Sequence, residues 1–224
     1  MEKERLITVK GIGALTVSVD FIEMFFTFDE VNKDYRKGYE LFESHILEIQ
    51  NIIQKCGFDK KDLKTSELKE RTEYEQVKKN GSYVGVFKGY NFHTEMILRF
   101  DFSSSKLNEV FSAITKSKAA PRIKVEFTVK DKEAVKKALL GSAAKDAKEK
   151  ADILCQSLDV KLGSLVKINY NWEEIHIHSN TFYDMEEKMI GWGSSPDLYS
   201  TGIDYTPDDI DVTDDASFVW EIID

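Results

Sequence analysis

Hydrophobic and polar residues alternate along the first thirty residues in the manner of half-buried β-strands. Leu6–Ile12 is the first predicted strand, closed by Gly11 and Gly13. The next alternating apolar positions are Leu15, Val17 and Val19. After Asp20 the apolar positions change parity, to Ile22, Met24, Phe26 and Phe28. This change predicts a bulge within one strand, or a stretch that is buried on both faces.

Three later segments change to the three- and four-residue spacing of amphipathic helices. Residues 33–56 form a long first helix that ends before Gly57, a residue suited to a C-terminal cap. Ser103–Ser105 offer N-caps to a second helix, whose apolar face consists of Leu107, Val110, Phe111 and Ile114. Asp131 can cap a third helix, to about residue 158. Its apolar stripe is mostly small: Val135, Ala138, Leu139, Ala143, Ala147, Ala151, Leu154 and Leu158. Such a stripe predicts close packing on a sheet or on the first helix.

Strands fill the remaining patterned segments. Lys79–Ser82 contains Asn-Gly, the preferred pair for a two-residue hairpin turn between two extended segments. The other predicted strands are Tyr90–Phe102, Ile123–Val129, Val166–Trp172 and a terminal strand at 212–223. The predicted fold is therefore α+β, an antiparallel-rich sheet packed by a long first helix, a shorter second helix and an Ala-striped third helix. We expect a single domain over 1–224, divisible into two subdomains.

The charge is distributed unevenly. The formal net charge is −9, but residues 171–224 alone hold fourteen acidic side chains and one basic one. No Lys- and Arg-rich cluster accompanies stacking aromatics, so nucleic acid is not an expected partner. Residues 173–210 combine acid, proline and aromatics, and predict a long, partly looped excursion from the core.

Composition also bears on the compartment. No apolar run reaches the roughly 18 residues that span a bilayer, so no membrane span is expected. The opening residues lead directly into a predicted strand without an apolar h-region, and two cysteines cannot form a disulfide framework. These features favour the cytoplasm, and the cell envelope is the alternative if a leader was removed.

Several short motifs, taken in order, resemble the SIMPL-domain family. They are the opening strand Ile7–Gly13, the passage Cys56–Thr65, Gly89-Tyr90 before an alternating strand, the Ala-rich stretch Ala143–Ala151 and the exit Val160–Gly163. The resemblance covers about residues 6–170 and the last strand. It implies an α+β fold without established catalytic residues or cofactor, links to stress tolerance, export of bacterial members to the envelope, an adaptor role in a eukaryotic namesake, and homo-oligomers in some members.

One pair of residues suggests a metal site. His176 and His178 lie two apart, and on a strand both would project to one face, where two imidazoles can share zinc. Glu173 and Glu174 could add oxygen ligands, as could Asp184, Glu186 and Glu187. In the alternative, Ile175 and Ile177 face inward and both histidines face solvent. Because a third ligand at diagnostic spacing is missing, no bound metal or other cofactor is predicted.

Other candidate chemistry has a simpler explanation. Cys56 and Cys155 lie near apolar helix faces without a neighbouring histidine, and are expected to be buried and inert. His45 is expected to be a packed or surface histidine. The acidic run lacks the spacing of an EF-hand and is expected to be a solvated loop; its members are Asp204, Asp208, Asp209, Asp211, Asp214 and Asp215.

We therefore expect a non-enzymatic interaction or scaffold protein of the SIMPL type. The first alternative is a metal-binding module or metal-dependent enzyme centred on His176 and His178. A second is a ligand-binding module that uses the aromatics of the excursion and its flank: Trp172, Phe182, Tyr183, Trp192 and Tyr199. A homo-oligomer is the expected assembly, because some apolar side chains lack an obvious place in a small core; these are Met24, Phe26, Phe28, Val219 and Ile223.

Overall fold

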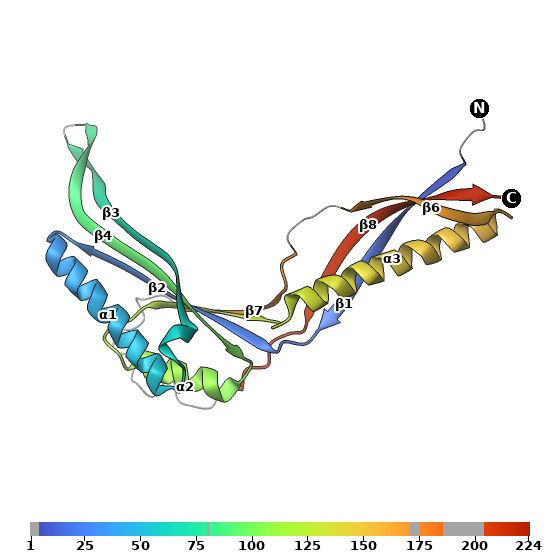
Figure 1. The fold of residues 1–224 in the computed structure, drawn as a ribbon. Helices are drawn as coiled ribbons and strands as arrows, with labels where there is room; N and C mark the ends of the chain where they lie inside the picture. The colour runs from blue at the N-terminus through green and yellow to red at the C-terminus, as the bar shows by residue number, and fades with distance from the viewer. Residues whose placement is uncertain (1–4, 80, 171–174, 186–203) are drawn as a thin grey trace. The chain divides into compact units, whose positions relative to one another are not determined.

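The fold is α+β, as the sequence pattern predicts: three α-helices accompany two antiparallel-rich sheets of three and five strands. It is seen in a computed structural model that describes residues 5–79, 81–170, 175–185 and 204–224 (Figure 1). The chain divides into two compact units. Unit 1 comprises residues 1–20, 128–180 and 208–224, and unit 2 comprises residues 21–127 and 181–207.

Unit 1 is a three-stranded antiparallel sheet with one long helix. Its strands are β1 (Leu6–Val17), β8 (Ile210–Ile223) and β6 (Lys161–Tyr170), in the order β1-β8-β6. The first and last strands of the chain pair along their whole length, from Leu6 opposite Glu221 to Val17 opposite Ile210. Helix α3 (Lys132–Ser157) packs against this sheet, and the Asp131 carboxylate caps it by accepting a hydrogen bond from the Ala134 N–H at 2.8 Å.

The small-residue stripe of α3 lies directly on β1. A Cβ built on Gly11 would lie 2.0 Å from the Ala143 carbonyl oxygen, and one on Gly13 would lie 2.2 Å from that of Leu139. Glycines on the strand and alanines on the helix therefore let the two backbones touch. The sequence left open whether this stripe packs on a sheet or on the first helix, and the structure shows that it packs on the sheet. The C-terminal end of the stripe differs from the prediction, because Cys155 is buried there while Leu154 and Leu158 are exposed.

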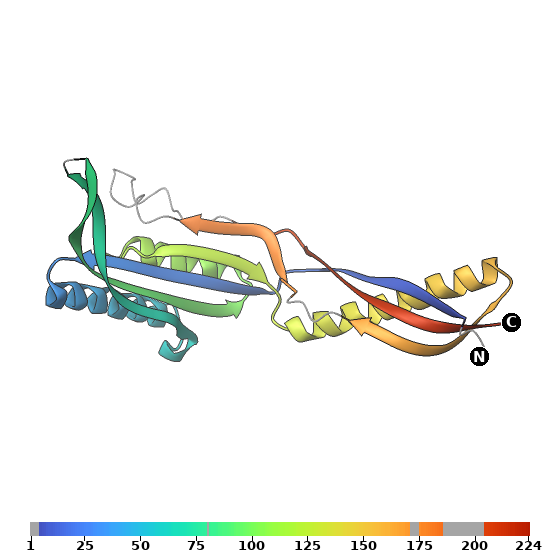
Figure 2. The same cartoon turned by 90° about the horizontal axis from the view of Figure 1, so that it is seen from above.

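Unit 2 is built on the five-stranded sheet, in the order β3-β4-β2-β5-β7. The strands are β2 (Phe21–Asn32), β3 (Leu63–Lys79), β4 (Ser82–Asp101), β5 (Arg122–Thr128) and β7 (His178–Met185). The helices are α1 (Tyr35–Lys55), the short 3₁₀ turn η1 (Lys60–Asp62) and α2 (Ser104–Thr115). Figure 2 shows the same elements from above.

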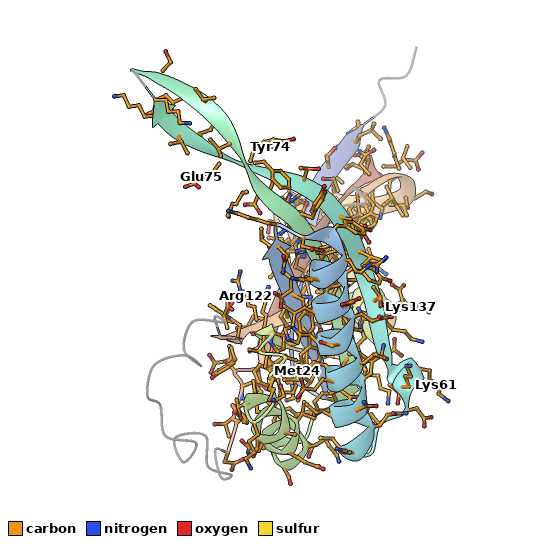
Figure 3. All side chains as sticks on the ribbon, turned by 90° about the vertical axis from the view of Figure 1, so that its left-hand side faces the viewer. Met24, Lys61, Tyr74, Glu75, Arg122 and Lys137 are labelled. Carbon is orange, nitrogen blue, oxygen red and sulfur yellow. The ribbon has the colours of Figure 1, made fainter. Side chains whose placement is uncertain are left out.

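The parity change after Asp20 marks the end of one strand and the start of another. β1 stops at Val17, β2 starts at Phe21, and the two strands belong to different sheets, so neither a bulge nor a doubly buried strand is present. The new parity simply points Met24, Phe26 and Phe28 into the core of unit 2, where all three are buried. They were wrongly predicted to mark an interface. Met24 lies inside this core in Figure 3.

The excursion contains a strand that the sequence pattern did not predict. β7 begins at His178 and joins the sheet beside β5, and the Arg122 guanidinium on β5 pairs with the Asp184 carboxylate at 2.7 Å. Among the described residues, no helix has the length and hydropathy that spanning a bilayer requires.

Candidate interaction site

The hairpin of β3 and β4 extends beyond the rest of its sheet. β4 is 20 residues long, whereas its other partner, β2, has 12 and pairs with it only from Asp101 to Tyr90. Past that point, among the residues that the structure describes, β4 pairs with β3 alone, as far as Lys79 opposite Ser82. We call residues 73–79 and 81–89 the hairpin ribbon. It projects past the end of α1 in Figures 1 and 3.

The turn of the ribbon follows the sequence prediction. β3 ends at Lys79 and β4 begins at Ser82, which leaves the two-residue Asn80–Gly81 connection. Gly81 has a φ of +85°, the left-handed conformation that such a turn requires. The tip is therefore a tight hairpin, and its two strands hold each other in register.

Both faces of the ribbon carry exposed apolar side chains. Directly paired residues share a face, and one face presents Tyr74 opposite Phe87 and Tyr83 opposite Lys78. The other face presents Val77 opposite Val84, with the exposed Val86 beside them. Tyr83 is 71% exposed and Tyr74 is 60% exposed, so most of each side chain faces solvent.

A row of aromatic rings ties the base of the ribbon to the core. Phe92 is buried under α1, and along β4 the rings of Tyr90 and Phe87 follow, with their centroids 5.3 Å apart. Tyr74 continues the row from β3, at 6.0 Å from Phe87. The Phe87 end of the row is held by edge-to-face packing, while Tyr83 and Val84 lie beyond it. Within the described residues, this aromatic row reaches Tyr74 and Phe87 and stops short of the tip.

A groove lies beside α1 on the same sheet face as Tyr90 and Phe92. Leu68 and Glu70 of β3 face Thr94 and Phe92 across the ladder, so they point toward the helix. The groove has a volume of about 260 Å³ and is lined by Tyr39, Phe42, Glu43, Ile46, Leu47, Gln50, Leu68 and Glu70. We call it the α1–β3 groove. Leu68, at its rim, is 62% exposed.

The polar groups of the groove are mostly acceptors. The Tyr35 hydroxyl donates to the Glu70 carboxylate at 2.8 Å, and this hydrogen bond is the main reason why the pKa of Tyr35 is raised. Glu43 supplies a second carboxylate on the helix side. The buried Oε1 of Gln50 has no hydrogen-bond partner among the described residues. No lysine or arginine lines the groove in that part of the chain.

The proposed metal ligands do not share a strand face in the described residues. His176 lies outside β7 and is exposed, whereas His178 is the first residue of the strand and is half-buried. Ile177 between them is buried in an apolar cluster with Ile210 and Val212, as the inward-facing alternative requires. Glu173 and Glu174 lie outside the described residues. Metal binding at the two histidines stays a prediction.

Three of the six aspartates in the acidic run belong to strand β8. Asp211 accepts a hydrogen bond from the Thr16 hydroxyl at 2.6 Å, and Asp214 accepts one from the Tyr170 hydroxyl at 2.8 Å. Asp215 forms an ion pair with Lys10 at 3.1 Å. These three sit on β8 and fasten it to its neighbours, so for them the expected solvated loop is wrong.

The remaining candidates occupy structural positions. Cys56 and Cys155 are both buried free thiols, and burial raises the pKa of Cys56. His45 is part-buried, with Nδ1 2.8 Å from the Glu30 carboxylate. In the excursion, Tyr183 packs edge-to-face on Phe111 at 5.0 Å. Phe182 is exposed, and the aromatics Trp172, Trp192 and Tyr199 lie outside the described residues.

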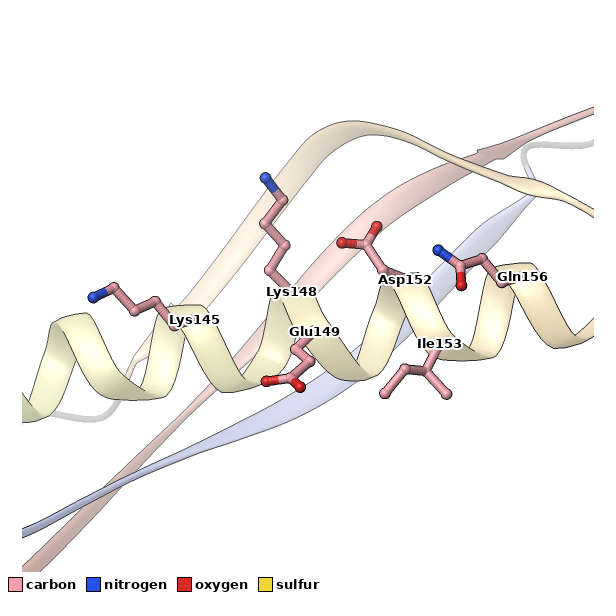
Figure 4. Close-up of a pocket in the computed structure, with 6 residues that line it drawn as sticks. All are labelled: Lys145, Lys148, Glu149, Asp152, Ile153 and Gln156. Carbon is pink, nitrogen blue, oxygen red and sulfur yellow. The ribbon is translucent and has the colours of Figure 1, made fainter.

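A second hollow, on α3, lacks the walls of a binding site. Its lining residues all come from this one helix: Lys145, Lys148, Glu149, Asp152, Ile153 and Gln156 (Figure 4). The two lysines come first and the two acids follow them along a solvated helix face. Charge substitutions on this surface are therefore a suitable control for charge substitutions elsewhere in the chain.

The sequence patterns missed the ribbon and the groove as sites. Tyr83, Val84 and Leu68 were not singled out, although the Asn-Gly turn correctly placed the hairpin. The available signal was length, because a strand that continues past its neighbour must expose its end. Recognising the groove required knowing that α1 lies against this sheet face.

Comparison with known proteins identifies the family. A family model for SIMPL, described as a protein of unknown function (DUF541), matches residues 7–220. No curated protein matches the chain. The match runs from the first strand of unit 1 through unit 2 to the last strand, and it agrees with the motifs at Ile7–Gly13 and Val160–Gly163. This chain belongs to the SIMPL family.

Proposed function

We propose that this protein is a non-enzymatic, self-associating interaction or scaffold protein, and that the hairpin ribbon is its assembly element. The observation that carries the proposal is the exposure of apolar side chains on both faces of a ribbon that, within the described residues, pairs with no third strand. An isolated two-stranded hairpin is marginally stable in water. A partner that covers a ribbon of this length would therefore stabilise it.

The composition of the tip supports binding. Contiguous exposed apolar groups on a soluble protein usually mark an interaction surface. Tyrosine is common at such surfaces because it combines a large apolar ring with a hydroxyl group. Tyr83 and Val84 lie at the far end of the ribbon, where they can enter a depression on another molecule without a rearrangement of the sheet. A role in stress tolerance and the compartment, cytoplasm or cell envelope, stay predictions.

Light scattering coupled to size exclusion tests the proposal. We expect the wild-type chain to show a mass above 25.7 kDa that rises with concentration. Tyr83→Ser with Val84→Ser should shift this mass toward 25.7 kDa, since it removes the apolar tip while leaving the turn intact. Phe182→Ser is the matched control, because it removes another exposed aromatic of unit 2. A wild-type mass of 25.7 kDa at every concentration would refute self-association.

A further inference from the structure

The ribbon and the α1–β3 groove of one chain cannot meet each other. Both belong to unit 2, and β3 runs without interruption from Glu70 in the groove to Lys78 opposite Tyr83. Eight residues of strand separate them, roughly 26 Å along the chain at about 3.3 Å per residue. The β3–β4 pairing has a register shift between Glu73 and Tyr74, the ribbon bends away from the rest of the sheet (Figure 1), and Tyr83 near its tip is exposed to solvent.

Pairing between two β3 edges is the obvious alternative contact, and the sequence of β3 disfavours it. β3 is the edge strand of its sheet, and a long uncovered edge can pair with a copy of itself. From Lys64 to Lys79 this edge carries alternating charged residues, among them Lys69, Glu70 and Arg71. Charged side chains on an edge strand are a common protection against such pairing.

The tip and the groove are complementary in charge and in polarity. Lys78 and Lys79 stand beside the apolar tip, and neither is in an ion pair within the described residues. The groove offers the carboxylates of Glu43 and Glu70 around an apolar floor. The Oε1 of Gln50 is an acceptor that has no partner among the described residues, and a lysine or the Tyr83 hydroxyl is a donor suited to it.

The size of the groove also favours side chains over a metabolite. Its volume of about 260 Å³ is below the roughly 300–1,000 Å³ typical of small-molecule pockets. We propose that the α1–β3 groove receives the hairpin tip of a second copy of this chain, with Tyr83 on its apolar floor and Lys78, which is paired with Tyr83 on the same face, toward Glu43 and Glu70. This inference rests on the proposed function and names the contact through which the chain self-associates.

The contact joins two different surfaces, and each copy carries one of each. Two copies can therefore exchange tips around a two-fold axis, or pass the contact from copy to copy in a ring. In both arrangements Lys78 of one chain opposes the glutamates of another. Reversing one set of charges places like charges together, and reversing both sets restores opposite charges.

Charge reversal tests this arrangement by sedimentation equilibrium at low salt. Lys78→Glu with Lys79→Glu should weaken self-association by about tenfold or more, since like charges facing each other across an interface are unfavourable. Glu43→Lys with Glu70→Lys should weaken it similarly, and Glu43→Lys alone should do so while keeping the Tyr35–Glu70 hydrogen bond. The four changes combined in one chain should return the dissociation constant to within about threefold of wild type.

Lys145→Glu with Lys148→Glu on the solvated face of α3 is the matched control (Figure 4). It changes the net charge by the same amount as the ribbon substitution, so it measures general repulsion between more acidic chains. We expect it to leave self-association close to wild type. Equal weakening by the control and the ribbon substitution, or no recovery in the combined variant, would overturn the contact while leaving self-association standing. A monomeric wild-type chain would instead overturn the proposed function.

Discussion

A methyl group added to Gly11 or Gly13 should destabilise unit 1. Alanine at Gly11 would place its Cβ 2.0 Å from the Ala143 carbonyl oxygen and 2.7 Å from the Ala147 Cβ, and alanine at Gly13 would lie 2.2 Å from the Leu139 oxygen. Side-chain carbons essentially never approach closer than 3.0 Å, so α3 or β1 must move by about 1 Å. Because the obstructing atoms are backbone atoms, a change of rotamer cannot relieve the clash.

The expected loss is about 1–3 kcal/mol for each substitution, the range for overpacking a close-packed interior. The smaller entropy of the unfolded alanine chain offsets roughly 0.4–1 kcal/mol of it. For a domain of about 60–100 residues, each kcal/mol lowers the melting temperature by about 4–8 °C. Urea unfolding followed by tryptophan fluorescence, in a background with Trp172→Phe and Trp192→Phe, and by far-ultraviolet circular dichroism would measure the change, since Trp220 is buried in unit 1.

Gly141→Ala is the matched control on the same helix. Gly141 lies within α3 and has no atoms within 4 Å of a built Cβ, so alanine there should stabilise by about 0.5–1 kcal/mol. The reasoning would be refuted if Gly11→Ala and Gly13→Ala matched wild type within about 0.5 kcal/mol, since the intimate packing of α3 on β1 would then be wrong.

Three further outcomes follow from described contacts. The Asp146 carboxylate accepts a hydrogen bond from the Ile12 N–H at 2.7 Å, and this bond is the main reason why the pKa of Asp146 is lowered. Asp146→Ala should therefore destabilise the protein above the ordinary carboxyl pKa of 3.8. In acid unfolding, the difference in stability from wild type should vanish as the pH falls through the lowered pKa of Asp146. Gly38→Ala should cost about 1 kcal/mol in urea unfolding, despite the better helix propensity of alanine, because its Cβ would lie 2.6 Å from a buried phenylalanine ring; a gain in stability would contradict the packing of α1. Cys56 and Cys155 should react with a thiol reagent only after denaturant is added, and rapid labelling of the native protein would contradict their burial.

The helices were predictable because their signals are local. The side chains of Ser103 and Asp131 each cap a helix by accepting a hydrogen bond from a backbone N–H in its first turn, as predicted from the sequence. Gly57 has the positive φ expected after α1. The hairpin turn is local in the same sense. Each of these features depends on residues within one helical turn or one hairpin, so a pattern along the chain is enough to locate them.

The strand partners were not predictable, because pairing joins distant parts of the chain. Nothing in the alternation of Leu6–Val17 indicates that it pairs with Ile210–Ile223, and Met24 looked surplus only because the five-stranded core was unknown. The same limit applies to the candidate site. The overhang of β4 is a difference in length between two paired strands, and it appears only when the pairing is known.

Amide hydrogen exchange of the ribbon at increasing protein concentration tests the central claim most directly. The ribbon amides that do not bond across the β3–β4 pair face solvent in a single chain, and those that do belong to a two-stranded ladder that opens readily. If the ribbon is the assembly element, exchange at residues 73–79 and 81–89 should slow as concentration rises, while exchange in α3 stays constant. Ribbon exchange that stays equally fast at every concentration, while the mass measured by light scattering rises, would contradict the account.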